Sequence, residues 1–208
     1  MSIYMGELVH QAETLEIAAG QFNEGLHSRD SDNVRRIFAA VQSLLGAAAM
    51  MSKLLKPDPP GFRWDGSPLS PEETRQRKLS IDRGKQLRDA LLVKGDHPIT
   101  QRSVRNAFEH FDDRLDRYLE ANPTASVVDL YVGPAGGIVV DPPIPYLRHV
   151  DNETLMVSVL DKSVNIQSLY DAAKDVGDRA RHWIGGHFAN LRPLPGEAPT
   201  GSGTINDL

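Results

Sequence analysis

The chain has 208 residues, of which 40% are apolar and 25% charged, and its formal net charge is −5. This composition excludes an intrinsically disordered chain and a protein that coats nucleic acid through a generally basic surface, so any nucleic-acid contact must be local. The absence of cysteine excludes disulfides, thiolate metal ligands and cysteine nucleophiles. We therefore expect one globular domain with a substantial core.

The first residues of the chain do not have the pattern of an export signal. They lack a basic patch followed by an unbroken apolar run, and Glu7, Glu13 and Glu16 interrupt them. The most apolar window, residues 41–55, contains polar side chains and is too short to span a bilayer. These features predict a cytoplasmic protein with no transmembrane segment and no membrane partner.

Two long amphipathic helices are predicted at the start of the chain. Small and apolar residues recur there at alternating spacings of three and four, which places them on one helical face. The first stripe ends near His27 and the second at Lys56-Pro57, so an antiparallel hairpin is expected. The stripes consist of Leu8, Ala12, Leu15, Ala19, Phe22 and Leu26, and of Val34, Ile37, Val41, Leu44, Ala48, Met51 and Leu55.

Two further helices are expected after an irregular proline-rich crossing at residues 57–71. Ser70 followed by Pro71 and two glutamates has the form of an N-cap, which predicts a third helix that ends near Val93. A fourth helix should begin at Thr100 and end at Asn122-Pro123. Its core-facing residues would be Val104, Phe108, Phe111, Leu115 and Tyr118.

The sequence pattern changes from helical to strand-like between about residues 126 and 161, where short β-branched runs alternate with turn residues. A small antiparallel meander is the simplest arrangement. A last helix follows, with a stripe from Ile166 to Trp183, and should close near Gly185-Gly186. The predicted fold is a mainly α, four- to five-helix up-down bundle over residues 1–190 with this β-rich insertion, and residues 191–208 form a mobile tail.

A polar stripe lies on the predicted fourth helix, opposite its apolar face. At about 100° per residue, the spacing places Asn106, His110, Asp113 and Arg117 along one side of the helix. Arg105 immediately precedes Asn106 near the start of the helix. The stripe therefore points away from the core. A structural interpretation is a solvated face, since Arg105 with Glu109 and Asp113 with Arg117 are stabilising i,i+4 pairs.

The string Arg105-Asn106-Ala107-Phe108-Glu109-His110 resembles the signature of the HEPN superfamily, an arginine and a polar residue followed, after three variable residues, by histidine. The resemblance in sequence covers six residues. It is supported by their position, because the signature lies near the start of a late helix in the family and in the first turns of the predicted fourth helix here. It implies a bundle of four or five helices that forms a homodimer. Arg105, Asn106 and His110 of each copy would then make half of a shared site that cleaves RNA without metal, or binds RNA or a nucleotide.

These residue types suit the implied chemistry. A histidine can take a proton from a ribose 2′-hydroxyl near neutral pH. Arginine can hold the phosphate and stabilise its developing charge, and an asparagine four residues before the histidine can orient it. The flanking residues Asp112, Asp113 and Asp116 would repel RNA at the same place.

Neither a metal nor a cofactor is expected. The pairs Glu7-x-x-His10 and Glu24-x-x-His27 lie about 25 Å apart along one helix, at about 1.5 Å per residue, and cannot share a metal cluster. The glycine-rich segment at residues 133–137 lacks the lysine of a phosphate-binding loop and is interpreted as a turn. The alternative function is a non-enzymatic helical scaffold or interaction module that binds a partner protein at the β-rich insertion.

Overall fold

The computed structural model describes residues 1–28, 30, 32–57, 61, 67–100, 106, 111–124, 126–139, 141 and 144–189. The predicted tail, residues 191–208, lies outside the described residues. The helices are α1 (Ser2–His27), α2 (Asn33–Leu55), α3 (Pro71–Leu91), the short η1 (Pro98–Thr100), α5 (Phe111–Ala121) and α6 (Ile166–Ala189). The strands are β1 (Tyr131–Val132), β2 (Arg148–Asp151), β3 (Met156–Val159) and β4 (Lys162–Asn165). A mainly helical protein with a small sheet before the last helix is thus confirmed.

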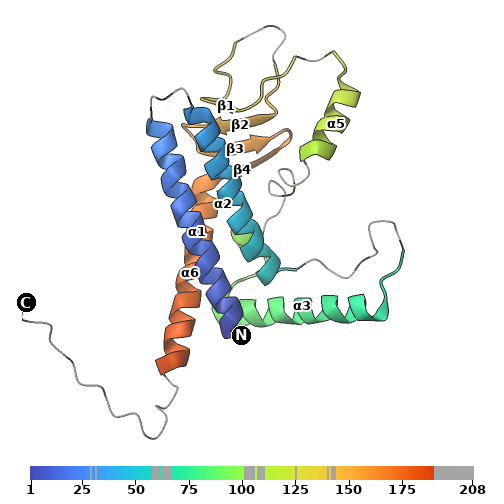
Figure 1. Cartoon of the computed structure of the whole chain (residues 1–208), viewed down its shortest axis with the longest axis vertical. Coiled ribbons are helices and arrows are strands. Elements are labelled where there is room, and N and C mark those ends of the chain that lie inside the picture. The colour runs from blue at the N-terminus through green and yellow to red at the C-terminus, as the bar shows by residue number, and fades with distance from the viewer. Residues whose placement is uncertain are drawn as a thin grey trace, which may run out of the picture.

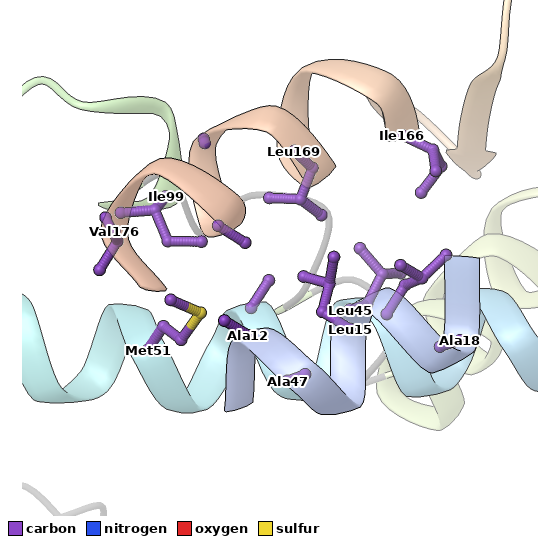
Figure 2. Close-up of a cluster of buried hydrophobic side chains, with 14 of the residues drawn as sticks. Ala12, Leu15, Ala18, Leu45, Ala47, Met51, Ile99, Ile166, Leu169 and Val176 are labelled. Carbon is purple, nitrogen blue, oxygen red and sulfur yellow. The ribbon is translucent and has the colours of Figure 1, made fainter. Parts of the chain in front are cut away.

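Helices α1, α2 and α6 pack lengthwise against one another and supply most of the core (Figure 1). Leu8, Val41 and Ala173 are fully buried, as their stripes predicted. Figure 2 shows apolar side chains of the three helices meeting in one cluster with Ile99 of η1. A Cβ built on Gly177 of α6 would lie 2.5 Å from the Cβ of Ala12, so α1 and α6 approach closely at this point.

Helix α2 is also the one helix in the described part of the chain that is long and apolar enough to cross a membrane. In this fold 61% of its most apolar window is buried against the neighbouring elements. Burial of this kind is typical of a core helix.

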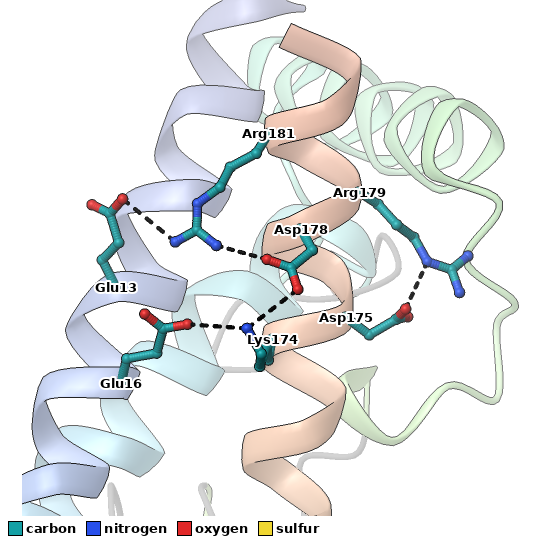
Figure 3. Close-up of polar contacts among 7 residues, drawn as sticks. All are labelled: Glu13, Glu16, Lys174, Asp175, Asp178, Arg179 and Arg181. Atoms are coloured by element: carbon teal, nitrogen blue, oxygen red, sulfur yellow. Dashed lines mark hydrogen bonds and ion pairs between the residues drawn. The ribbon is translucent and has the colours of Figure 1, made fainter. Parts of the chain in front are cut away.

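A chain of charged side chains joins the surfaces of α1 and α6 (Figure 3). Arg181 contacts Glu13 at 3.4 Å and Asp178 at 2.8 Å. Lys174 contacts the same Asp178 at 3.4 Å and Glu16 at 3.8 Å. These groups are half-buried or exposed at the surface, so each pair contributes little to stability, about 0–1 kcal/mol.

Helix α3 crosses one end of the three-helix core rather than running along it (Figure 1). Its start has the predicted capping box: Ser70 Oγ accepts from the Glu73 amide at 3.2 Å, and Glu73 Oε2 accepts from the Ser70 amide at 2.7 Å. Only Gly84, Leu87 and Leu91 of this helix are buried. The guanidinium of Arg179 on α6 donates to the carbonyls of Leu91 and Leu92 and holds the end of α3 in place.

The sheet has the order β1-β2-β3-β4 and is mixed, which corrects the predicted antiparallel meander. β2, β3 and β4 pair antiparallel, whereas β1 pairs parallel with β2, with Tyr131 opposite His149. Parallel pairing needs a crossover connection, and residues 133–147 supply it. Val150 and Val157 from the inner strands join the helical core.

Two predictions about individual helices, the core position of α5 and the end of α6, were wrong. Helix α5 has no buried residue, and Phe111, Leu115 and Tyr118 are partly exposed, so this helix is not part of the core. Of the expected bundle, the described elements show α1, α2 and α6 packed lengthwise, with α3 crossing one end and α5 beside the sheet (Figure 1). Helix α6 continues through Gly185-Gly186 to Ala189, and the ring of His187 stacks on Trp183 across these glycines.

Candidate functional site

Two of the three predicted site residues, Arg105 and His110, lie outside the described residues. Asn106 is helical and partly buried. The predicted polar stripe continues into α5, where Asp113 and Arg117 are both exposed, as expected for a stripe that faces away from the core. The structure therefore describes the surroundings of the predicted site only along α5, which carries Asp113 and Arg117.

Two arginine contacts hold α5 against the sheet. The guanidinium of Arg148 on β2 lies over the ring of Phe111, at 4.6 Å from its centre. Arg148 also donates to both carboxylate oxygens of Asp129, and this bond holds the pKa of Asp129 below its usual range. Arg114, one turn further along α5, contacts Asp161 at 3.2 Å.

Asp161 stands at the tip of the β3–β4 hairpin and is anionic at neutral pH. Its pKa is lowered mainly by a hydrogen bond from Lys162, with a smaller contribution from the charge of Arg114. The Nζ atom of Lys162 lies 2.6 Å from the carboxylate. The tip of the hairpin therefore places a negative charge, that of Asp161, beside Arg114 of α5.

Between α5 and the sheet lies a cavity of about 490 Å³, here called the α5 cleft. Its volume is in the range of small-molecule sites, which is about 300–1,000 Å³. The walls combine two guanidinium groups and one carboxylate with aromatic and aliphatic side chains. Its lining residues are Arg114, Arg117 and Tyr118 of α5, and Pro145, Tyr146, Leu160 and Asp161 of the sheet region.

Tyr146, one wall of the α5 cleft, is fixed by an aromatic stack. Its ring centre lies 4.7 Å from that of Tyr131 and 4.9 Å from that of His149, with interplanar angles of 9° and 30°. Its hydroxyl accepts from the Ile138 amide at 3.3 Å. The buried His149 donates from Nε2 to the Gly133 carbonyl at 2.8 Å, because a carbonyl can only accept. Tyr146 is therefore held in one orientation before any ligand arrives.

The glycine-rich segment 133–137 is a turn, closed by the Gly137 amide that donates to the Pro134 carbonyl at 3.0 Å. Its glycines make room for the Tyr131 hydroxyl: a Cβ on Gly133 would lie 2.6 Å from that oxygen, and a Cβ on Gly137 would clash with it outright. Glycine is required here by the close approach of a side chain. The segment thus closes over the aromatic stack.

Asp151 ties this turn to the rest of the sheet. It is only 7% exposed, and its carboxylate accepts from the amides of Ala135, Glu153 and Thr154 at 2.9–3.3 Å. These bonds, the one from Thr154 foremost, hold its pKa below the usual range. The carboxylate is therefore ionised and structural at neutral pH.

Comparisons of the chain with protein-family models, with curated proteins and with solved structures found no match. The described residues contain no group of three or more His, Asp or Glu side chains that could hold a metal ion. Of the residues in the α5 cleft, sequence reasoning placed Arg117 on the polar stripe but missed Arg114, Tyr146 and Leu160. Only the spacing of Arg114 one turn before Arg117 could have drawn attention to it.

Proposed function

We propose that this protein is a dimeric, HEPN-like RNA-binding protein in which Arg105, Asn106 and His110 of two copies form a metal-independent endoribonuclease site. The observation that carries this proposal is the α5 cleft. Arg117 belongs to the same polar stripe as Asn106 and His110, and it lines a cavity that also contains Arg114 and two tyrosines. Guanidinium groups beside aromatic rings suit the phosphates and bases of single-stranded RNA.

The charge distribution agrees with a local RNA contact. A chain of net charge −5 has no general attraction for a polyanion, so affinity must come from a few cations gathered in one place. Arg114, Arg117 and Arg148 gather between α5 and the sheet. In the proposed reaction His110 accepts the 2′-hydroxyl proton, and the 2′-oxygen bonds to phosphorus as the bond from phosphorus to the 5′-oxygen breaks. The leaving 5′-oxygen takes a proton from water, and Arg105 stabilises the charge that develops on the phosphate.

One observation favours the alternative, a helical scaffold or interaction module that contacts a partner protein. Asp112, Asp113 and Asp116 are all exposed on α5, and their charges oppose a phosphate backbone. On this alternative the polar stripe is a solvated face and the sheet region is the contact surface. The two functions differ in whether RNA is bound and cut.

The test is incubation of the purified protein with mixed RNA in the presence of a chelator. We expect cleavage by the unmodified chain and its loss in His110→Ala and Arg105→Ala. Both variants should keep the melting temperature of the parent, because the helical spacing predicts that both side chains face away from the core, and surface replacements change stability by about 0.5 kcal/mol or less. Absence of cleavage and of RNA binding in the unmodified chain would favour the scaffold.

A further inference from the structure

Three of the cavities among the described residues differ in chemistry. The cavity at the α1–α2 turn, about 370 Å³, places Glu24 and Arg36 together. The cavity between α1 and the start of α6, about 360 Å³, has Glu16 as its charged residue. Of the three, the α5 cleft is the one lined by two guanidinium groups together with aromatic rings. It therefore has the strongest basis for a ligand.

The cationic side of the α5 cleft can hold one phosphate. Arg114 and Arg117 are three residues apart on α5, so their side chains project from neighbouring positions on one face. Arg114 is already paired with Asp161. Arg117 uses only Nε in its bond to the Asp113 carbonyl, at 2.9 Å, out of the five donors of a guanidinium group. Its two terminal nitrogens match the fork that binds a phosphate bidentately.

The other side of the cleft suits a flat ring. Tyr118, Pro145 and Leu160 supply apolar surface, and the prearranged ring of Tyr146 adds an aromatic wall. Tyrosine rings stack with nucleobases irrespective of base identity. The nearby Asp161 carboxylate can accept hydrogen bonds from a ribose hydroxyl or a base amino group.

Leu160 lines the α5 cleft from the turn between β3 and β4. Its φ of 52° is in the left-handed region, where a non-glycine residue is uncommon, and it occupies the first position of the two-residue β3–β4 turn. A glycine would adopt this conformation without steric cost. Leucine at this position costs of the order of 1 kcal/mol relative to glycine, and its side chain supplies apolar surface to the cleft.

We infer that the α5 cleft binds one nucleoside monophosphate unit, with the phosphate on Arg117 and the base against Tyr118, Tyr146 and Leu160. The unit is either a free nucleotide or one residue of an RNA strand. The inference concerns the described lining residues and not Arg105 or His110, and its link to RNA rests on the function proposed above. The β-rich insertion then supplies half of the ligand-binding wall.

Isothermal titration of the full chain with adenosine 5′-monophosphate, adenosine, inorganic phosphate and a short RNA tests the inference. We expect one monophosphate unit bound per chain, with adenosine and phosphate at least about tenfold weaker because each contacts only one side of the cleft. If the short RNA binds and the free nucleotide does not, the unit belongs to a strand. If phosphate alone binds as tightly as the nucleotide, or if neither nucleotide nor RNA binds, the inference is wrong.

Two variants and one control distinguish a loss of ligand binding at the α5 cleft from a loss of folding. Arg117→Gln should weaken nucleotide binding about tenfold, while Arg75→Gln, which removes an exposed arginine on α3, should have no effect. Leu160→Gly should weaken binding without lowering the melting temperature, since it relieves the backbone strain while it removes the wall. Equal binding by all three variants would overturn the inference. Nucleotide binding that depends on Arg117 in a chain that cuts no RNA would leave the subsite standing and reject the nuclease.

Discussion

The guanidinium of Arg148 lies 4.6 Å from the centre of the Phe111 ring, so the first residue of α5 rests on the second strand of the sheet. The same guanidinium donates to both oxygens of Asp129. Arg148 thereby joins α5, β2 and the segment before β1. The position of α5, and with it the width of the α5 cleft, depends on this side chain and on the Arg114–Asp161 pair.

The first prediction concerns Phe111, which its spacing placed in the core. A core phenylalanine replaced by alanine costs about 3–5 kcal/mol. Because Phe111 is partly exposed and contacts Arg148, we expect Phe111→Ala to cost about 1 kcal/mol and to weaken nucleotide binding. Urea unfolding beside titration measures both effects. Leu119→Ala, at an exposed position on the same helix, is the control. A loss of 3 kcal/mol or more would place Phe111 in the core after all.

The second prediction is that Gly137→Ala disturbs the aromatic stack. The new methyl group would overlap the Tyr131 hydroxyl, and relief of such overpacking costs about 1–3 kcal/mol. Unfolding curves and tyrosine fluorescence should both change. Gly95→Ala places a methyl group in open space at another turn and should leave both signals unaltered. Identical behaviour of the two variants would show that the turn does not close on Tyr131.

The third prediction compares two glycines of α6. Gly177→Ala should destabilise the protein by about 1–3 kcal/mol, because its methyl group meets Ala12 across the α1–α6 contact. Gly185→Ala should stabilise it by up to about 1 kcal/mol, since the position is helical with open space around it. Thermal melts of both variants show whether the melting temperature falls for Gly177→Ala and rises for Gly185→Ala. Equal shifts would contradict the close approach of the two helices.

The fourth prediction is the response to acid. The pKa values of Asp129, Asp151 and Asp161 are lowered in the folded state, so their stabilisation is fully present above the ordinary aspartate pKa of about 3.9. It is lost as the pH falls below that value through the lowered pKa values. We expect tyrosine fluorescence from the sheet region to stay constant from neutral pH to about pH 4 and to change below it. A transition well above pH 4 would contradict the role given to these three carboxylates.

The three core helices could be predicted from the sequence because their burial pattern is local. The helical period of about 3.6 residues is visible in each of the three stripes, to which Leu8, Val41 and Ala173 belong, without knowledge of what the stripes pack against. The same argument failed for α5. Phe111 and Leu115 show the spacing, but they face the sheet and solvent, and spacing alone does not say what a face packs against.

The sheet was harder to predict because its features are set by distant residues. β4 is built of Lys162, Ser163, Val164 and Asn165, a polar run that carries no strand signal and pairs only because β3 precedes it. The parallel pairing of β1 depends on the crossover at residues 133–147. The α5 cleft was not predictable for the same reason, since Arg117 and Leu160 are distant in sequence and meet only when α5 docks on the hairpin.

The central claim, a site shared by two copies, is tested most directly by sedimentation of His110→Ala with a short RNA. This variant should bind RNA without cutting it. We expect a dimer of about twice the 22.9 kDa chain mass that holds RNA, and loss of RNA from the dimer when Arg105→Ala is added. A monomer that binds one RNA per chain, or a dimer whose RNA binding is unchanged by Arg105→Ala, would contradict the shared site.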